Sequence, residues 1–282
     1  MKEKRFFLSA LIMLFFGLII LFLYNKSMAY EEDETLKKQM DALLLTLQNK
    51  IEETTHVALA SSVILAKNPY VVQCLQTHRR SECIDYLLDI KNTMASSEIF
   101  DNARLHLHTN DFKSFIRLWD YRNESNDDLS SFRHALEKVK TTHRPVRGIE
   151  IGRNGMYMRA IAPVFNGDTY TGTIETVVDF HELSRYFKKD GVELYVLMKN
   201  EYKTIANAFT YHAKLTLKNY TIINQETNGL NFIKAINFQG TGYLKHGDSY
   251  VLYTPIIDIN GEHIGFFVLT WSESLSLASF KG

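Results

Sequence analysis

The chain has no excess of charge of either sign. Its 282 residues include 32 lysines and arginines and 32 aspartates and glutamates, so the formal net charge is zero. A neutral balance argues against a strongly basic face for nucleic acid and against an acidic tail. We therefore expect no nucleic-acid partner, and electrostatics alone indicate no other partner.

The sequence also lacks the short motifs of common enzymes and cofactor sites. It has no cysteine-histidine haem signature, no glycine loop that would cradle a phosphate and no nucleophile elbow. His106 and His108 have the strand spacing that places two imidazoles on one face, but no third ligand accompanies them at a fixed spacing. We predict that the protein is not an enzyme and has neither a cofactor nor a metal site.

One long apolar run is present, near the N-terminus. Residues 6–24 are mostly apolar, span roughly 28 Å as a helix and follow four charged residues, Lys2, Glu3, Lys4 and Arg5. We predict that residues 1–5 are cytoplasmic, that residues 6–24 cross the inner membrane, and that everything after Asn25 lies outside. A cleaved signal peptide ending at Ser27-Met28-Ala29 is the alternative, although the apolar core of such a peptide normally has only about 7 to 15 residues.

A long amphipathic stalk helix is predicted over residues 31–67. No glycine or proline interrupts this segment, and apolar side chains recur at steps of mostly three or four. Such a stripe could bury against a domain or against a second copy of the chain. Asn68-Pro69 is expected to end the helix.

The only two cysteines, Cys74 and Cys83, flank a short polar stretch. A disulfide can persist in an exported domain, and a bridge here would close a small loop and contribute about 2 to 3 kcal/mol. We predict this disulfide. Two free buried thiols are the alternative, and the spacing is far from the Cys-x-x-Cys of a redox pair.

The remaining sequence predicts an α+β fold with two PAS-like antiparallel-sheet modules, residues 68–180 and 181–271. In the first, a helix over 127–142, capped by Asp127 or Asp128, separates two groups of strands. The five predicted strands are 104–108, 114–119, 146–151, 156–165 and 170–179. In the second module, strands are expected near 193–198, 243–245, 249–257 and 263–270. Asn-Gly pairs after residues 153, 165 and 259 indicate hairpins.

Four blocks of sequence resemble a known family. They are LHLHTNDFKSFIRLWD (105–120), DDLSSFRHALEKV (127–139), PVRGIEIGRNGMYMRAIAPV (145–164) and GTIETVVDF (172–180). They resemble the double Cache sensory domain of bacterial chemoreceptors and sensor kinases, most of all the subfamily described as the double sensory domain of two-component sensor kinases. The resemblance implies an anchor, a stalk helix, a membrane-distal and a membrane-proximal Cache module, then a second transmembrane helix and an output domain. We expect the output domain to be absent, because only residues 272–282 follow.

Charged and aromatic residues of the distal module form the candidate ligand site. Alternation places Arg117 and Trp119 on one face of the second strand, where the guanidinium could hold a carboxylate and the indole could wall the pocket. The resemblance implies an Arg-x-Trp pair for amino-acid binding and an acidic residue in the last distal strand, for which we choose Glu175. The full predicted set is His106, Arg117, Trp119, Arg133, Glu150, Tyr157, Arg159 and Glu175. The alternative is a structural salt-bridge network of Arg133, Glu150, Arg159 and Glu175.

These expectations predict the extracytoplasmic ligand-sensing region of a membrane-anchored bacterial receptor, of the chemoreceptor or sensor histidine kinase type. It would bind a small polar metabolite, an amino acid or a carboxylate, in the distal module, and would act as a homodimer in the inner membrane. The alternative is a truncated or degenerate sensor that acts as an anchored protein-interaction module without small-molecule binding.

Overall fold

The computed structural model describes residues 2–77, 79–96, 103–123, 126–209, 216–224, 233 and 236–272. The chain divides into a first compact unit, residues 1–47, and a second, residues 48–276. The segment 273–282, predicted as the C-terminal end, lies outside the described residues.

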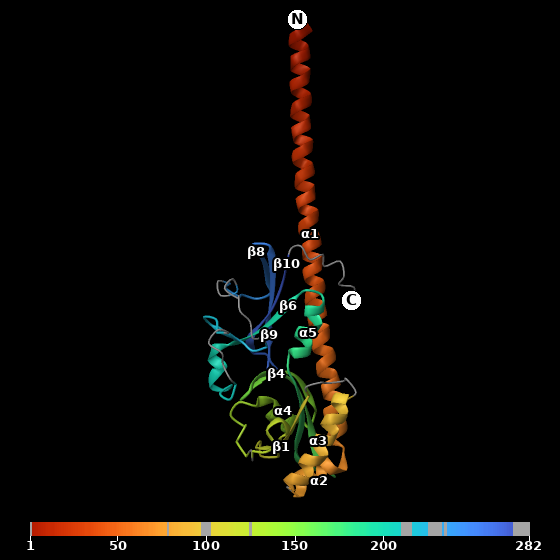
Figure 1. The fold of residues 1–282 in the computed structure, drawn as a ribbon, viewed down its shortest axis with the longest axis vertical. Helices are drawn as coiled ribbons and strands as arrows, with labels where there is room; N and C mark the ends of the chain where they lie inside the picture. Colours follow the sequence, from red (N-terminus) through yellow and green to blue (C-terminus); the bar gives the residue numbers. More distant parts are fainter. Residues whose placement is uncertain are drawn as a thin grey trace. The chain divides into compact units, whose positions relative to one another are not determined.

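A single helix, α1 (Lys2–Ala66), contains both the predicted anchor and the predicted stalk (Figure 1). Among the described residues it is the one helix long and apolar enough to cross a membrane, judged by length and composition. Its large apolar side chains between Ile12 and Tyr24 are exposed. The expectation of a long N-terminal helix is confirmed, and the helix ends shortly before Pro69 as predicted.

The first sheet is antiparallel and has the strand order β2-β1-β5-β4-β3. In its centre β1 pairs with β5, and the register places His106 opposite Glu175 and Leu107 opposite Ile174. Because side chains alternate along a strand, one face of this sheet is apolar and the other carries charged and imidazole side chains. The five strands are β1 (Arg104–Thr109), β2 (Ser114–Arg117), β3 (Val146–Gly152), β4 (Gly155–Asn166) and β5 (Thr169–Val178).

Helices cover the apolar face of the first sheet. The short helices α2 (Pro69–Thr77) and α3 (Arg80–Ser96) carry Cys74 and Cys83, which form the predicted disulfide. Their apolar side chains, together with Leu65 and Ala66 of α1, share one buried cluster with the sheet. The strand residues of this cluster are Leu105, Leu107, Ile116, Ala162, Val164 and Ile174.

Two details of the first module were predicted wrongly. The second strand ends at Arg117, so Trp119 lies in a short 3-10 helix, η1 (Leu118–Asp120), and not in the strand. The helix α4 (His134–Thr142) begins later than expected, and neither Asp127 nor Asp128 caps it. The reason is that residues 127–129 are extended: Ser114 N donates to the Asp127 carbonyl oxygen and Leu129 N to the Phe112 carbonyl oxygen.

The second sheet has the order β7-β6-β10-β9-β8, which is the order of the first sheet when the strands are counted from β6. Its apolar core includes Leu197, Ile222, Phe238, Val251 and Phe266. The elements of this module are α5 (His181–Lys189), β6 (Glu193–Lys199), η2 (Asn200–Thr204), β7 (Tyr220–Ile222), β8 (Gly242–His246), β9 (Ser249–Ile257) and β10 (His263–Ser272). The four predicted strands are present, whereas α5, η2 and β7 were not predicted.

Candidate functional site

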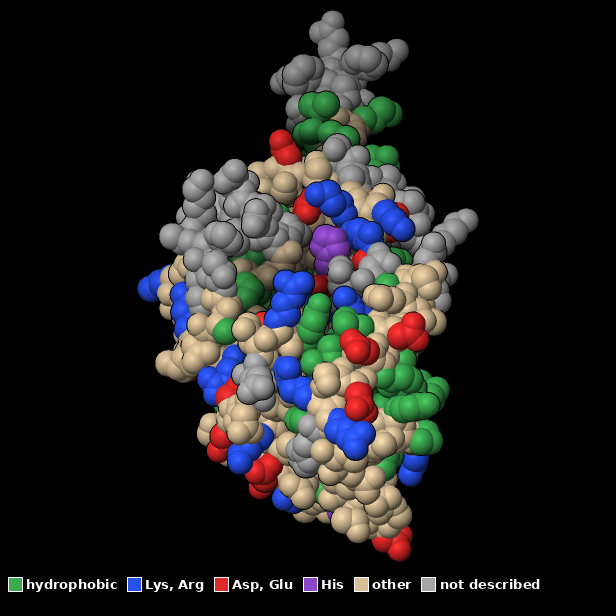
Figure 2. Space-filling view, turned by 60° about the horizontal axis from the view of Figure 1, so that its bottom comes forward, with side chains coloured by type: hydrophobic (Ala, Val, Ile, Leu, Met, Phe, Trp, Pro, Cys, Tyr) green, Lys and Arg blue, Asp and Glu red, His purple; other side chains and the backbone are tan. Residues whose placement is uncertain are grey.

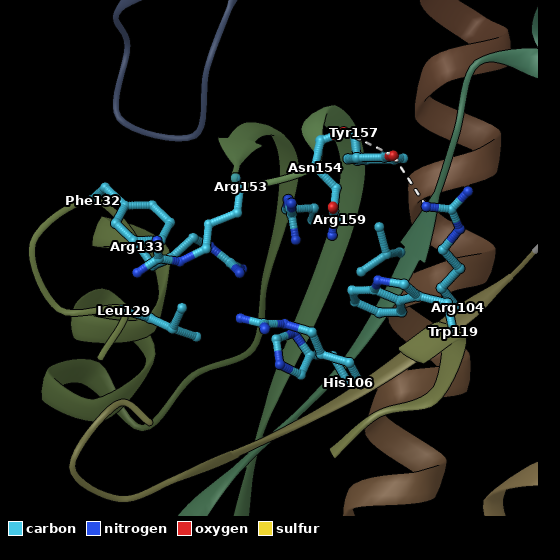
Figure 3. Close-up of a pocket in the computed structure, with 13 residues that line it drawn as sticks. Arg104, His106, Trp119, Leu129, Phe132, Arg133, Arg153, Asn154, Tyr157 and Arg159 are labelled. Atoms are coloured by element: carbon cyan, nitrogen blue, oxygen red, sulfur yellow. Dashed lines mark hydrogen bonds between the residues drawn. The ribbon is translucent and has the colours of Figure 1, made fainter. Parts of the chain in front are cut away.

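A small cavity lies on the charged face of the first sheet, beside the segment that leads into α4. Its volume is about 20 Å³, which is room for about one water molecule. Figure 3 shows Arg104 and Trp119 on one side of it, Phe132 and Arg133 on the other, and His106 between them. The lining residues are Arg104, His106, Arg117, Trp119, Leu129, Phe132, Arg133, Gly152, Arg153, Asn154, Tyr157, Arg159 and Val177.

Among the described residues, five arginines and no acidic residue line this cavity. Asp127 pairs with two of them, with Arg117 Nη2 at 2.6 Å and Arg153 Nε at 2.8 Å. Burial raises the pKa of the Asp127 carboxyl, but the hydrogen bond and charge of Arg117 outweigh it and lower the pKa overall. Among the described residues no carboxylate pairs with Arg104, whose Nη1 instead donates to the Tyr157 hydroxyl at 3.1 Å.

Arg133 and Arg159 line the cavity and belong to a buried network with two glutamates, Glu150 and Glu175. Arg133 donates from Nε to Glu150 Oε2 at 2.6 Å and from Nη2 to Glu175 Oε1 at 2.5 Å. Arg159 Nη1 donates to the same Glu175 oxygen at 2.9 Å. Burial alone would raise the pKa of the Glu175 carboxyl, but Arg133 and Arg159 hold it well below its usual range. All four side chains are at most 5% exposed and satisfy one another's charge.

Two adjacent histidines of β1, with their rings tilted by 53° to each other, lie beside this network. His106 Nδ1 and His108 Nε2 are 3.0 Å apart, and the two rings are also hydrogen-bonded to Ser114 and Thr173. Burial lowers the pKa of His106 to about 4, although Glu175 opposes this effect. Burial, with His106 next to it, lowers the pKa of His108 well below its usual value. Both imidazoles are therefore neutral at physiological pH.

The structure brings most of the predicted site residues together. His106, Arg117, Trp119, Arg133, Tyr157 and Arg159 line the cavity. Glu150 and Glu175 do not line it and lie behind it, bonded to Arg133. Arg104 and Arg153 also line it, although they were not in the predicted set. Gly152 contributes space, because a Cβ atom there would lie 2.5 Å from Arg159 Nη2.

A larger cavity of about 370 Å³ adjoins the small one. The two share Arg104, Asn154 and Tyr157 as lining residues, so these three side chains form the boundary between them. Its other described lining residues come from both modules and include Asp179, Phe180, His181, Phe209 and Asn224.

The long helix, the two sheets of equal strand order and the charged cavity in the first sheet define a double sensory domain. The chain belongs to the family described as the double sensory domain of two-component sensor kinase, which matches residues 33–274. No curated protein sequence matches the chain.

Solved structures with this fold have low sequence identity to the chain. The extracellular domain of vpHK1S-Z8, assigned as a histidine kinase, has a TM-score of 0.50 and 12% identity, over 89% of this chain and 96% of that one. The sensor domain of the V. cholerae histidine kinase DctB has a TM-score of 0.46 and 12% identity, over 83% of this chain and 94% of that one. The ligand-binding domain of the Campylobacter jejuni chemoreceptor Tlp3, in complex with L-valine, has a TM-score of 0.44 and 13% identity, over 86% of this chain and 94% of that one. At such identities the likeness concerns the fold alone.

Proposed function

We propose that this chain is the extracytoplasmic sensing region of a membrane-anchored bacterial receptor, of the sensor kinase or chemoreceptor type, and that it binds a small carboxylate in the cavity of the first sheet. The observation that carries the proposal is the cavity lining, which in the part of the chain that the structure describes has five arginines and no acidic residue. Guanidinium groups bind carboxylates through paired, charge-assisted hydrogen bonds.

The charge balance around the cavity favours an anion. Five arginines line it, and three carboxylates pair with them: Asp127, Glu150 and Glu175. Five positive charges against three negative ones leave an excess of two. Basic and acidic side chains are interspersed over the face of the molecule in Figure 2, so this local excess is not part of a general basic surface.

An amino acid fits this lining less well than an organic acid. Its carboxylate would find arginines, but its ammonium group would need an acceptor, and Glu175 is fully buried behind the cavity. Aromatic rings at Trp119 and Tyr157 remain available for an amine. Amino acids are therefore the second candidate class and belong in the same screen.

Ligand entry requires the small cavity to open. A volume of about 20 Å³ is far below the roughly 300 to 1,000 Å³ of typical ligand pockets. The adjoining cavity of about 370 Å³ is large enough for a small metabolite. Movement of Arg104 and Tyr157 would join the two, because both side chains line both cavities. The ligand would then bias the position of Arg104, and α1 would carry the change toward the membrane in a homodimer.

The test is thermal unfolding of the full chain in detergent against a panel of organic acids, amino acids and amines. A ligand at 100 times its dissociation constant should stabilise the chain by about 2.7 kcal/mol and raise the midpoint by several degrees. We expect an organic acid to give this shift, Arg104→Gln and Arg117→Ala to abolish it, and the exposed-site control Arg144→Ala to retain it.

Two results would overturn the proposal. One is a flat screen on a chain that unfolds cooperatively, which would favour an anchored protein-interaction module without a small-molecule ligand. The other is an equal shift in wild type and both cavity variants, which would place the ligand elsewhere.

A further inference from the structure

Three buried side chains converge on one point in the first sheet. His106 and His108 extend from the same face of β1, and Glu175 lies opposite His106 on β5. His106 Nδ1 is 3.4 Å from Glu175 Oε2, His108 Nε2 is 3.5 Å from it, and the two ring nitrogens are 3.0 Å apart. All three residues are at most 2% exposed.

We propose that His106 Nδ1, His108 Nε2 and Glu175 Oε2 form a binding site for a divalent transition-metal ion, with Zn²⁺ as the first candidate. In a tetrahedral zinc site with bonds of about 2.0 to 2.1 Å, neighbouring ligand atoms are separated by roughly 3.3 to 3.4 Å. The three observed separations, 3.0, 3.4 and 3.5 Å, bracket this value. Two imidazoles and a carboxylate are donors that Zn²⁺ and neighbouring transition metals accept.

The outer atoms of the two imidazoles are held as metal-binding histidines usually are. His106 Nε2 lies 2.8 Å from the Ser114 hydroxyl oxygen, and His108 Nδ1 lies 2.8 Å from the Thr173 hydroxyl oxygen. Such outer hydrogen bonds orient the ring so that its inner nitrogen can face an ion. Both hydroxyl-bearing side chains are themselves buried, so water does not compete for them.

The carboxylate also has one oxygen to spare. Glu175 Oε1 accepts hydrogen bonds from Arg133 and Arg159, while Oε2 is buried and has no hydrogen-bond partner among the described residues. A buried, unpaired carboxylate oxygen is costly. A metal ion between Oε2 and the two ring nitrogens would remove this cost.

The competing explanation is a cluster without an ion, in which one ring donates an N–H group to the other across their 3.0 Å separation. That arrangement leaves Glu175 Oε2 buried without a hydrogen bond, which is the cost that an ion would remove. The separations of 3.4 and 3.5 Å exceed the 2.7 to 3.2 Å of ordinary N–H···O hydrogen bonds. The two ring nitrogens are, in addition, closer to each other than to the carboxylate. An ion would add two positive charges beside Arg133 and Arg159, so we expect only moderate affinity. We expect tighter metal binding when an anion occupies the small cavity, which His106 also lines.

The test is metal binding by the full chain after removal of metals with a chelator. We expect one equivalent of Zn²⁺ per chain after dialysis, and visible absorption bands of tetrahedral Co²⁺ when cobalt replaces zinc. His108→Gln and Glu175→Gln should lose the bound metal, and the exposed-site control His134→Gln should keep it. Thr173→Val, which removes only the outer hydrogen bond of His108, should bind about 10- to 100-fold more weakly.

The readout is metal content and cobalt absorption, so it does not depend on the identity of the organic ligand. If His108→Gln or Glu175→Gln fails to fold, X-ray absorption of the wild-type zinc complex decides the matter, because two imidazole ligands are expected. A wild-type chain that retains no zinc and gives no tetrahedral cobalt bands would overturn the proposal. An unchanged zinc content of folded His108→Gln and Glu175→Gln would also overturn the proposal.

Discussion

Tyr157 holds Arg104 at the boundary between the two cavities. The Tyr157 hydroxyl accepts a hydrogen bond of 3.1 Å from Arg104 Nη1 and donates one of 3.1 Å to the Asn154 carbonyl oxygen (Figure 3). The guanidinium carbon of Arg104 also lies 5.2 Å from the centre of the Tyr157 ring and 5.9 Å from that of Trp119. Arg104 therefore has to give up these contacts before a ligand can pass.

Tyr157→Phe should make that passage easier. The substitution keeps the ring and removes the hydroxyl, and with it the hydrogen bond from Arg104 and the one to the Asn154 carbonyl oxygen. Each such bond is worth about 0.5 to 1.5 kcal/mol. We expect a small loss of stability and faster association of the acid that the thermal screen identifies, measured by stopped-flow mixing. Tyr243→Phe, at an exposed tyrosine of the second module, should leave the association rate unchanged. A slower or unchanged rate in Tyr157→Phe would contradict the boundary role.

Glu175→Gln should be strongly destabilising. Among the described residues, Glu175 is the one carboxylate that pairs with Arg159, whose Nε also donates to the Glu150 carbonyl oxygen. The change leaves the buried Arg159 guanidinium without a directly paired negative charge. Breaking a buried pair in this way costs about 3 to 5 kcal/mol. Urea denaturation at neutral pH measures the loss, with Glu137→Gln on the exposed side of α4 as the control. A loss no larger than that of the control would show that the network contributes little.

Ser62 and Ser61 offer a matched comparison on α1. The Ser62 hydroxyl is buried, accepts a hydrogen bond of 3.1 Å from Thr176 N and lies 2.9 Å from the Ala160 carbonyl oxygen. Ser62→Ala leaves buried polar groups of β4 and β5 unpaired and should cost about 1 to 3 kcal/mol. The Ser61 hydroxyl is bonded only to the carbonyl of Val57 in its own helix, so Ser61→Ala should change the unfolding free energy by less than about 0.5 kcal/mol. Equal effects would mean that this contact does not hold the helix on the sheet.

Removal of the disulfide should lower stability without changing ligand affinity. Cys74 and Cys83 are 9 residues apart, and a loop of that size corresponds to about 2 to 3 kcal/mol and to a fall of the midpoint by roughly 5 to 10 °C. The bridge packs on the helix-covered face of the sheet, opposite the cavity. The double variant Cys74→Ala/Cys83→Ala should therefore keep the wild-type dissociation constant for the ligand. A reducing agent should lower the unfolding midpoint of the wild type but not that of the variant. A large change in affinity would show that α2 and α3 are coupled to the site.

Local patterns predicted the strands well because alternation and Asn-Gly turns are read from neighbouring residues. The hairpin at Gly167, with a φ of 58°, and the one at Gly261, with 88°, lie where glycine tolerates the left-handed region. The same alternation correctly placed His106 and His108 on one face of the first strand. It failed at Trp119, because the strand ends at Arg117 and residues 118–120 turn into a 3-10 helix, where strand alternation no longer applies.

The parts of the site that could not be predicted depend on contacts between distant segments. His106 and His108 were assigned no third metal ligand, since Glu175 is brought to them only by the pairing of β1 with β5. Nothing in the sequence shows that Arg117 pairs with Asp127 while Arg104 pairs with no carboxylate among the described residues. The helix α5 was missed because its nine residues, HELSRYFKK, are mostly polar and only Leu183 and Phe187 are buried.

The shared strand order has a consequence for synthesis. In each sheet the strand that comes last along the chain lies in the middle, β5 between β1 and β4, and β10 between β6 and β9. During synthesis the N-terminal part of the chain emerges first. The two halves of each sheet therefore cannot join until its last strand, β5 or β10, has emerged. The first sheet is complete at Val178, before any strand of the second has appeared. Because the chain emerges from one end, the first sheet can be completed before the second begins to form. This order keeps strands of the two similar sheets from pairing with the wrong module.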